Sequence, residues 1–225
     1  MAHEEHKVVV TALGPFGGKT FNPSTTLRDH LPERIERPDC TPIQVIKYEH
    51  DLRNTLSDME RIPKLWSCVE RVYNQNATES ARVHIDAMIH LGVHEDSCWE
   101  IEKQARRDGY AHKGDDGLFL PTSNGGKGER WEGLPWILTP LYDVESIVRR
   151  LDVKFSQLQI FSSNDPGRQY CGFLYYSSLA TLYKRGEAAR ALLVHIPPGC
   201  TAAERIDEGV DLIKAVLCEM IDALS

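Results

Sequence analysis

Residues 161–176, FSSNDPGRQYCGFLYY, decide the fold that we expect of this chain. The apolar run QLQIF predicts a strand that leads up to a turn at residues 164–167, where Asn, Asp, Pro and Gly follow one another. A helical pattern starts at once, with Asp165 as a natural N-cap and Pro166 at the first helical position, where a missing N–H costs nothing. The stretch therefore predicts a strand, a sharp turn and a helix, and it places Cys171 in the first or second turn of that helix.

Backbone N–H groups at such a strand-to-helix turn favour negative charge, either a thiolate or a developing oxyanion. The effect of the helix dipole fades within about one turn, so it can assist Cys171 but cannot alone make it reactive. A histidine partner is needed for that. His195 in LLVHIPPG, 24 positions further on, is the candidate.

Outside this stretch, apolar strands alternate with amphipathic helices. Apolar runs at residues 7–13, 81–93 and 191–196 are typical of strands covered on both faces, and residues 41–50 alternate like a strand. The predicted helices begin with residues 23–31, after the cap Asn22, and residues 51–76, with a kink or a restart at Pro63. Further helices are predicted over residues 142–151, with Asp143 as the cap, over residues 167–186, and over residues 201–224, which the capping box TAAE opens. This alternation predicts an α/β sandwich with a mostly parallel sheet.

A chain of 225 residues is long enough for a substantial core, and we expect a single domain over residues 1–225. Residues 1–6 are interpreted as a frayed tail. Residues 109–135 are rich in Gly, Asp, Asn and Lys and have no apolar period, which predicts a long loop excursion, either a lid or a disordered segment. The sequence leaves the oligomeric state open.

Charge and cysteine usage narrow the class of protein. A net charge of −7 argues against nucleic acid and anionic membranes as partners. The first apolar run is too short for a signal peptide or a membrane span, and the six cysteines contain no CxxC pair, so we expect a cytoplasmic protein with reduced thiols. His90 and His94 lie on a predicted strand and loop, where a spacing of four does not converge on a metal. We predict no cofactor and no metal.

Several chemical side chains fall near the ends of predicted strands, where open α/β sheets build their sites. Cys171 and His195 lie at the carboxyl ends of two strands, and Glu102 lies in the segment leaving a third. A cysteine nucleophile needs an imidazole to hold it as thiolate, and that imidazole needs an orienting acceptor, so these three residues supply a complete set. The alternative is structural, because a cysteine in an apolar helix usually serves packing and a histidine closing a strand is often a satisfied rim residue.

The loop GPFGGK follows the first strand and is rich in glycine. It lacks both GxxxxGK[ST] and GxGxxG, so neither nucleotide-binding fingerprint is met. One interpretation is a tight turn that needs positive φ at Gly17 or Gly18. The other is a pocket wall that carries Leu13 and Phe16.

Four segments together resemble pyroglutamyl peptidase type I, a cysteine peptidase family also called pyrrolidone-carboxylate peptidase. In family order they are VVVTALGPFGGKTFNPS, HLGVHEDSCWEIEK, SSNDPGRQYCGFLYYSSL and LLVHIPPG, and they span residues 8–200. Any one segment would be only suggestive. The combination is specific.

The resemblance implies a three-layer αβα sandwich of the phosphorylase/hydrolase-like kind, with a mixed but mostly parallel central sheet. It also implies removal of an N-terminal pyroglutamyl residue from peptides by a cysteine-type exopeptidase. Carried over position by position, the family's catalytic triad falls on Glu102 in EIEK, Cys171 in RQYCGF and His195 in LVHIP. Glu95 and Glu100 crowd the same segment and stay open as alternatives for the carboxylate.

The family's aromatic pocket for the lactam ring maps onto Leu13 and Phe16. The sequence departs from the family here, since the family usually has Phe at Leu13 and Gly at Ala12, and it usually has Ala at Pro166. Leucine still supplies apolar surface but loses ring-on-ring stacking, worth roughly 0.5–1.5 kcal/mol.

The expected reaction is attack of the Cys171 thiolate on the pyroglutamyl carbonyl, with a thioester acyl-enzyme that water then hydrolyses. The partners implied are peptides with an N-terminal pyroglutamate. Two other interpretations remain open. One is a nucleoside phosphorylase-like enzyme that holds phosphate with GPFGG, and the other is a non-catalytic binding protein on the same fold.

Overall fold

The computed structural model describes residues 5–66, 84–120 and 129–224. Within them, seven strands form one sheet in the order β2-β3-β1-β4-β9-β5-β8, and two more form a small separate ladder. The large sheet consists of β1 (His6–Ala12), β2 (Arg34–Ile35), β3 (Ile43–Lys47), β4 (Ala87–Val93), β5 (Trp99–Glu102), β8 (Ile160–Ser163) and β9 (Ala191–Ile196), and the ladder of β6 (Ala105–Arg106) and β7 (Ile137–Leu138). The helices are α1 (Pro23–His30), α2 (Leu56–Leu65), α3 (Val144–Lys154), α4 (Tyr170–Lys184) and α5 (Ala203–Asp222), with a 3₁₀ turn at Glu129–Trp131.

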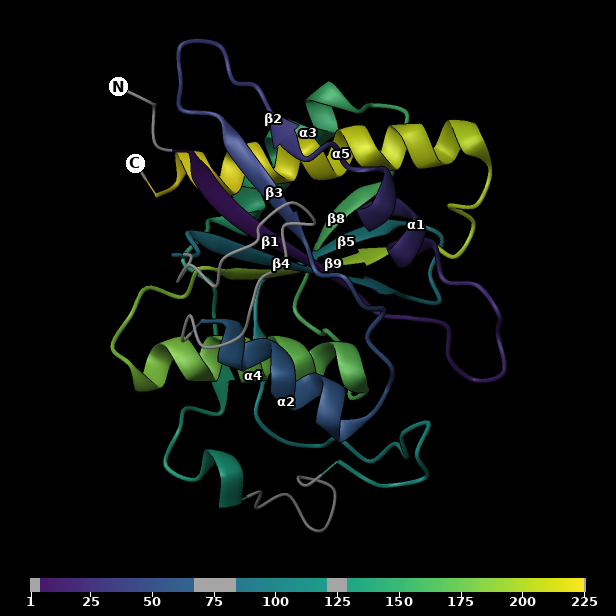
Figure 1. The fold of residues 1–225 in the computed structure, drawn as a ribbon, viewed down its shortest axis with the longest axis vertical. Coiled ribbons are helices and arrows are strands. Elements are labelled where there is room, and N and C mark those ends of the chain that lie inside the picture. The colour runs from purple at the N-terminus through teal and green to yellow at the C-terminus, as the bar shows by residue number, and fades with distance from the viewer. Residues whose placement is uncertain (1–4, 67–83, 121–128, 225) are drawn as a thin grey trace, which may run out of the picture.

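Helices cover both faces of the large sheet, so the fold has three layers (Figure 1). α1, α3 and α5 lie on one face, and α2 and α4 lie on the other. Val8 and Val10 of β1 pack into the first layer of helices and Val9 into the second, as the two-residue alternation of a strand requires. All three side chains are 0% exposed, which explains a continuous apolar run. The predicted three-layer α/β sandwich is confirmed.

The sheet is mixed in direction. β3, β1, β4 and β9 run parallel to one another, whereas β5 pairs antiparallel with β9, and β8 lies parallel to β5. The turn that leads to Cys171 therefore follows a strand that runs against β9. The expectation that this turn and His195 share the carboxyl edge of parallel strands is wrong, because a local apolar pattern does not encode strand direction. Cys171 approaches the end of β9 from α4 instead.

Two helices begin where the sequence predicts. The Asn22 side chain accepts a hydrogen bond from the Ser24 N–H at 3.0 Å ahead of α1, and Asp143 accepts from the Ser146 N–H at 3.1 Å ahead of α3. Pro63 lies inside the last turn of α2, which ends at Leu65. Residues 67–76 of the longer helix predicted there lie outside the described residues.

Two other helices begin later than predicted. The N-cap of α4 is Gln169 rather than Asp165, because Gly167 has a φ of 76°, a left-handed conformation that cannot belong to the helix. The N-cap of α5 is Ala202, so the capping box predicted from TAAE does not form. Cys171 nevertheless falls in the first turn of α4, as predicted.

Three further expectations concern irregular segments. His6 already belongs to β1 and pairs with Ile43, while residues 1–4 of the predicted tail lie outside the described residues. Gly17 and Gly18 have φ values of 61° and 78°, which confirms the predicted tight turn. Of the strand predicted over residues 81–93, residues 87–93 form β4, and residues 81–83 lie outside the described residues.

The described parts of the excursion over residues 109–135 are anchored on α4. The rings of Tyr110 and Trp131 lie 5.4 Å and 4.9 Å from the ring of Phe173, and Leu120 is also buried. These three apolar residues are too far apart in sequence to produce a period, so the pattern did not predict their burial. The segment between them, residues 121–128, is not among those described.

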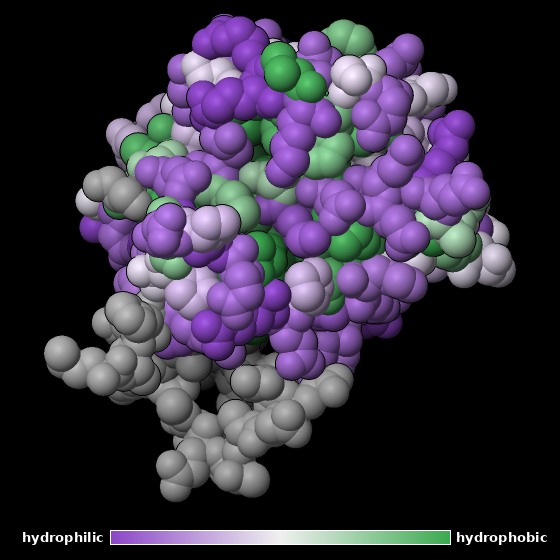
Figure 2. Space-filling view, turned by 90° about the horizontal axis from the view of Figure 1, so that it is seen from above, coloured by the Kyte–Doolittle hydropathy of each residue, from purple (hydrophilic) through white to green (hydrophobic). Residues whose placement is uncertain are grey.

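The outer surface is mostly polar on the side of α3 and α5. Figure 2 shows this face covered mainly by hydrophilic side chains, with apolar surface in small patches between them. Of the helices described here, none is long and apolar enough to cross a membrane.

Candidate active site

Cys171 is the second residue of α4 and is half-buried. Its sulfur rests against the backbone of Gly92 in β4. A methyl group added at Gly92 would lie 2.8 Å from the Cys171 Sγ and 3.4 Å from the His195 Cδ2, closer than real Cβ contacts allow for the sulfur. Glycine at this position therefore makes the space in which the thiol meets the imidazole.

His195 stands near the end of β9, directly beside Gly92 in the parallel ladder. It is only 2% exposed, and its Nδ1 lies 2.7 Å from the Oε1 of Glu102, which is 0% exposed. Glu102 is the last residue of β5. Its backbone carbonyl accepts a hydrogen bond from the Tyr175 hydroxyl at 3.1 Å, so α4 also contacts the carboxylate's own strand.

The charge of His195 is set by its partners. Burial opposes protonation, but hydrogen bonding to Cys171 and Glu102, together with the negative charges of both, outweighs burial and raises the pKa of His195 to about 10. The imidazole is therefore the positively charged member of the group at neutral pH. Sulfur, imidazole and carboxylate come together from α4, β9 and β5, and the structure thus brings Cys171, His195 and Glu102 into one cluster.

Glu95 and Glu100, the two alternatives for the carboxylate, do not hydrogen-bond the imidazole of His195. Glu95 is exposed on the loop after β4. Glu100 is paired with His195 in the antiparallel register of β5 and β9, yet Glu102 is the residue that hydrogen-bonds the imidazole. Burial raises the pKa of Glu100, and the nearby charge of Glu102 acts in the same direction against the opposing effect of His94.

Phe16 and Leu13, the two predicted substrate contacts, have different environments. A cavity of about 390 Å³ beside the ends of β4 and β9 is lined by Phe16, Lys19, Phe21, Pro23, Val93, Pro198 and their neighbours. Phe16 is one of the two aromatic residues of that lining. Leu13 does not line that cavity; it is 3% exposed and packs in the core below it.

A second buried histidine lies one strand away. His90 of β4 is 0% exposed, and its two ring nitrogens lie 2.8 Å from the hydroxyl of Thr11 and 2.8 Å from the hydroxyl of Ser178. Burial lowers the pKa of His90 to about 3, so this imidazole is neutral. Both nitrogens are thus occupied by hydroxyl groups, and His90 and His94 do not share a site.

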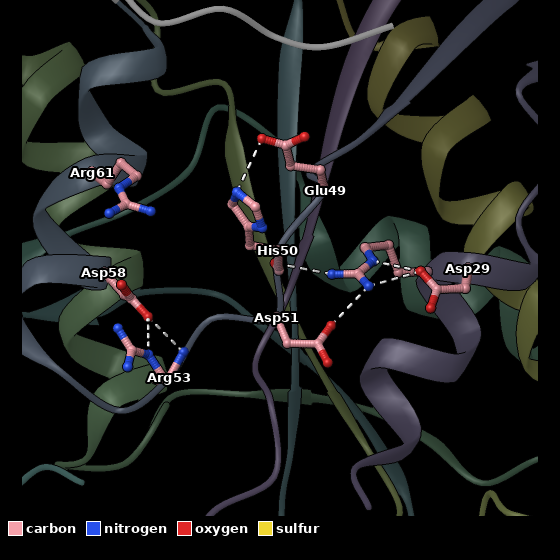
Figure 3. A pocket seen from close by; sticks show the side chains of 8 residues that line it. Asp29, Glu49, His50, Asp51, Arg53, Asp58 and Arg61 are labelled. Carbon is pink, nitrogen blue, oxygen red and sulfur yellow. Dashed lines mark hydrogen bonds and ion pairs between the residues drawn. The ribbon is translucent and has the colours of Figure 1, made fainter. Parts of the chain in front are cut away.

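A larger cleft of about 580 Å³ lies between α1 and α2, beyond the end of β3 (Figure 3). Charged side chains of both signs line it, but they pair with one another. Arg53 contacts Asp58, His50 contacts Glu49, and the nearly buried Arg28 reaches Asp51 at 2.8 Å. The described residues that line this cleft are charged and include no cysteine, so it lacks the nucleophile found at Cys171.

Sequence reasoning missed Gly92 and His94. A glycine within an apolar strand signals a close approach of another group, and HLGV carried that signal. The ring of His94 lies 5.2 Å from that of His195 at a tilt of 44°. No sequence pattern pointed to that contact, because it depends on the path of the loop after β4.

Comparison with known proteins agrees with the expected resemblance. No protein-family model matches the chain. Pyroglutamyl-peptidase 1 of Homo sapiens is 26% identical over 226 aligned positions, which cover 100% of this chain and 94% of the relative, and the Mus musculus protein of the same name matches equally.

Solved structures show the same fold. A mutant pyrrolidone carboxyl peptidase from Pyrococcus furiosus superposes with a TM-score of 0.74 at 18% identity, covering 97% of this chain and 100% of its own. Pyroglutamyl peptidase I from Bacillus amyloliquefaciens gives a TM-score of 0.73 at 18% identity, with 98% of both chains covered. The resemblance predicted from four sequence segments is confirmed over the full length of the chain.

Proposed function

We propose that this chain is a pyroglutamyl peptidase of type I, a cysteine peptidase that removes an N-terminal pyroglutamyl residue from peptides. The observation that carries the proposal is the contact of 2.7 Å between His195 and Glu102 beside the sulfur of Cys171. The similarity over the whole chain to proteins named pyroglutamyl-peptidase 1 supplies the substrate class.

In the proposed first step, the Cys171 thiolate attacks the carbonyl carbon of the pyroglutamyl residue and a carbon–sulfur bond forms. The carbonyl oxygen takes up the negative charge. Residues 170–172 open α4, so their backbone N–H groups have no partner within the helix and can donate to that oxyanion. A raised pKa for His195 supports its role as the proton source that follows.

In the second step, the His195 imidazolium donates its proton to the amine of the leaving peptide as the carbon–nitrogen bond breaks. The product is a thioester between Cys171 and the pyroglutamyl group. Neutral His195 then takes a proton from water, whose oxygen attacks the thioester and releases pyroglutamate and the thiolate. Glu102 holds the Nδ1 hydrogen of His195 throughout and fixes which nitrogen faces the sulfur.

Selectivity for the lactam is expected from the cavity at Phe16. The pyroglutamyl ring carries no free amine, whereas an ordinary peptide begins with an ammonium group that is costly to bury without a partner. The Phe16 and Phe21 rings and the Val93 side chain supply an apolar lining that suits the ring. An aminopeptidase would instead need a carboxylate at this position.

The test is release of a fluorescent amine from a pyroglutamyl amide, compared with the matching prolyl amide, which differs by its basic ring nitrogen. We expect hydrolysis of the pyroglutamyl substrate alone. Cys171→Ala and His195→Ala should each reduce the rate by at least about 10³-fold, because members of such a group act as a unit. Cys40→Ala removes an exposed thiol elsewhere and serves as the matched control.

Near wild-type hydrolysis by either active-site variant would end the proposal. Two further measurements address the two other interpretations. Phosphate-dependent cleavage of a nucleoside that persists in Cys171→Ala would favour a nucleoside phosphorylase-like enzyme, and a Cys171 that reacts with iodoacetamide no faster than Cys40 would favour a binding protein.

A further inference from the structure

The loop between β4 and β5 places metal-binding side chains next to the candidate active site. His94, Asp96 and Glu100 each bring one ligand atom within 4.8 Å of the other two. His94 Nδ1 lies 3.2 Å from Asp96 Oδ2 and 3.9 Å from Glu100 Oε2. Ligands on a tetrahedral zinc ion, with bonds of about 2.1 Å, stand about 3.4 Å apart, so small side-chain movements would give that geometry.

The charges also suit a divalent ion. A neutral imidazole with two carboxylates carries a charge of −2, which a dication would neutralise. Glu102 adds a further carboxylate within 4.8 Å of Glu100, and its Oε2 is buried without a hydrogen-bond partner among the described residues. The carboxylates of Glu100 and Glu102 lie close together, and one oxygen of Glu102 is buried without a partner among the described residues. This arrangement favours a cation next to Glu100.

The nearby group of Glu100, Glu102 and His195 is a poorer candidate. His195 Nδ1 and Glu102 Oε1 already bind each other at 2.7 Å, so a metal there would have to break the central contact of the active site. At His94 it would replace the hydrogen bond of 3.2 Å from the Asp96 N–H to Nδ1 and come between Nδ1 and Asp96 Oδ2, which are also 3.2 Å apart. The exposed Asp96 leaves a coordination position open to water.

We propose that His94, Asp96 and Glu100 form a binding site for a divalent transition-metal ion of the Zn²⁺ class, at the rim of the active site. The rings of His94 and His195 lie 5.2 Å apart. An ion bound to His94 therefore adds a second positive charge next to the protonated imidazole of His195, and its binding inhibits the enzyme. Imidazole and carboxylate ligands favour zinc over magnesium, which prefers oxygen ligands in an octahedral shell.

The test is calorimetric titration of the full, reduced chain with ZnCl₂. We expect Asp96→Asn and His94→Gln each to weaken Zn²⁺ binding by at least about tenfold, and MgCl₂ in excess not to compete. Glu95→Gln is the matched control, since it removes an exposed carboxylate of the same loop that is outside the cluster. It should change the affinity less than about twofold, and thermal melting should show that all three variants are folded.

A further variant separates this site from the thiol. Cys171→Ala should retain Zn²⁺ binding, and Asp96→Asn should retain basal hydrolysis but lose inhibition by Zn²⁺. If Cys171→Ala abolishes binding while Asp96→Asn preserves it, the ion is held by the thiol and the proposal is overturned. It is equally overturned if Asp96→Asn behaves like Glu95→Gln, or if the wild type binds no Zn²⁺ up to about 1 mM.

Discussion

His90 and His195 lie on neighbouring strands and are almost equally buried, at 0% and 2% exposure. At neutral pH, however, His90 is uncharged and His195 is positively charged. Burial lowers the pKa of His90 to about 3, because its partners are two neutral hydroxyl groups. The pKa of His195 rises to about 10 against the same burial, because a thiol and a carboxylate are its partners. The chemical nature of the partners, rather than depth in the protein, therefore decides which imidazole can donate a proton.

The two histidines also affect stability in opposite pH ranges. The folded-state pKa of His195 is raised, so its contribution is complete below about 6.5 and is lost as the pH rises towards about 10. The folded-state pKa of His90 is lowered, so the folded protein loses stability as the pH falls from about 6.5 towards about 3.

The largest expected effect comes from removing the carboxylate of Glu102, which helps to keep His195 protonated. Glu102→Gln keeps the shape but loses the carboxylate, and we expect kcat/KM to fall by roughly 10²–10⁴-fold. Because Glu102 helps to raise the pKa of His195, the alkaline limb of the kcat/KM profile should move to a lower pH than in the wild type. A pH-rate profile measures both quantities.

One outcome would contradict the assignment of Glu102 as the residue that orients His195. An unchanged profile for Glu102→Gln, with a shifted one for Glu100→Gln, would transfer the orienting role to Glu100.

A smaller effect is expected from closing the space between sulfur and imidazole. In Gly92→Ala the new methyl group would lie 2.8 Å from the Cys171 sulfur, so the thiol must move. Displacement of a reacting group by about 1 Å can cost about 10²-fold in rate. Gly199→Ala is the control, since its methyl group would meet only Arg205 Nη1 at 3.6 Å. Equal rates for both variants, measured with the pyroglutamyl amide, would refute the role of Gly92.

The neutral histidine gives a prediction about acid stability. Each pH unit between about 6.5 and about 3 should cost the folded state about 1.4 kcal/mol through His90. His90→Asn should lower stability at neutral pH but flatten this dependence, whereas His112→Asn, at an exposed position, should not change the slope. Urea unfolding at a series of pH values measures it. Parallel acid slopes in wild type and His90→Asn would show that His90 is not the group responsible.

The smallest expected effect concerns the hydroxyl that satisfies His90. Ser178→Ala leaves the Nε2 of His90 without its partner and should cost about 1–2 kcal/mol in the free energy of unfolding. Ser177→Ala removes only a hydrogen bond from the neighbouring hydroxyl to the Phe173 carbonyl within α4 and should cost less. Thermal melting compares the two, and a larger loss in Ser177→Ala would contradict the network around His90.

Local signals in the sequence predicted much of this arrangement. Asn22 and Pro23 are adjacent in sequence, so the start of α1 could be predicted from them alone. Cys171 was predicted in the first or second turn of its helix and lies in the first turn of α4. The cap was predicted wrongly, because the sequence did not show that Gly167 adopts a left-handed conformation.

What the sequence could not supply depends on contacts between distant segments. Glu100 and Glu102 lie two residues apart on one strand and therefore project from the same face, so spacing cannot choose between them. The choice follows from how β5 meets β9 and from the reach of each side chain to His195. The direction of β5 and β8 likewise comes from tertiary packing. The three residues that the resemblance named do lie together, although Cys171 reaches the end of β9 from α4 and not from the end of a parallel strand.

The cavity at Phe16 and the cluster around Cys171 are built by different parts of the chain. Residues 16–23, between β1 and α1, form most of the cavity, whereas α4, β5 and β9 supply sulfur, carboxylate and imidazole. Leu13 lines neither of them and packs in the core. Under the proposed function, substrate recognition and chemistry can therefore change separately. A library of variants confined to residues 16–22 could search for new acyl preferences while Cys171, His195 and Glu102 stay unchanged.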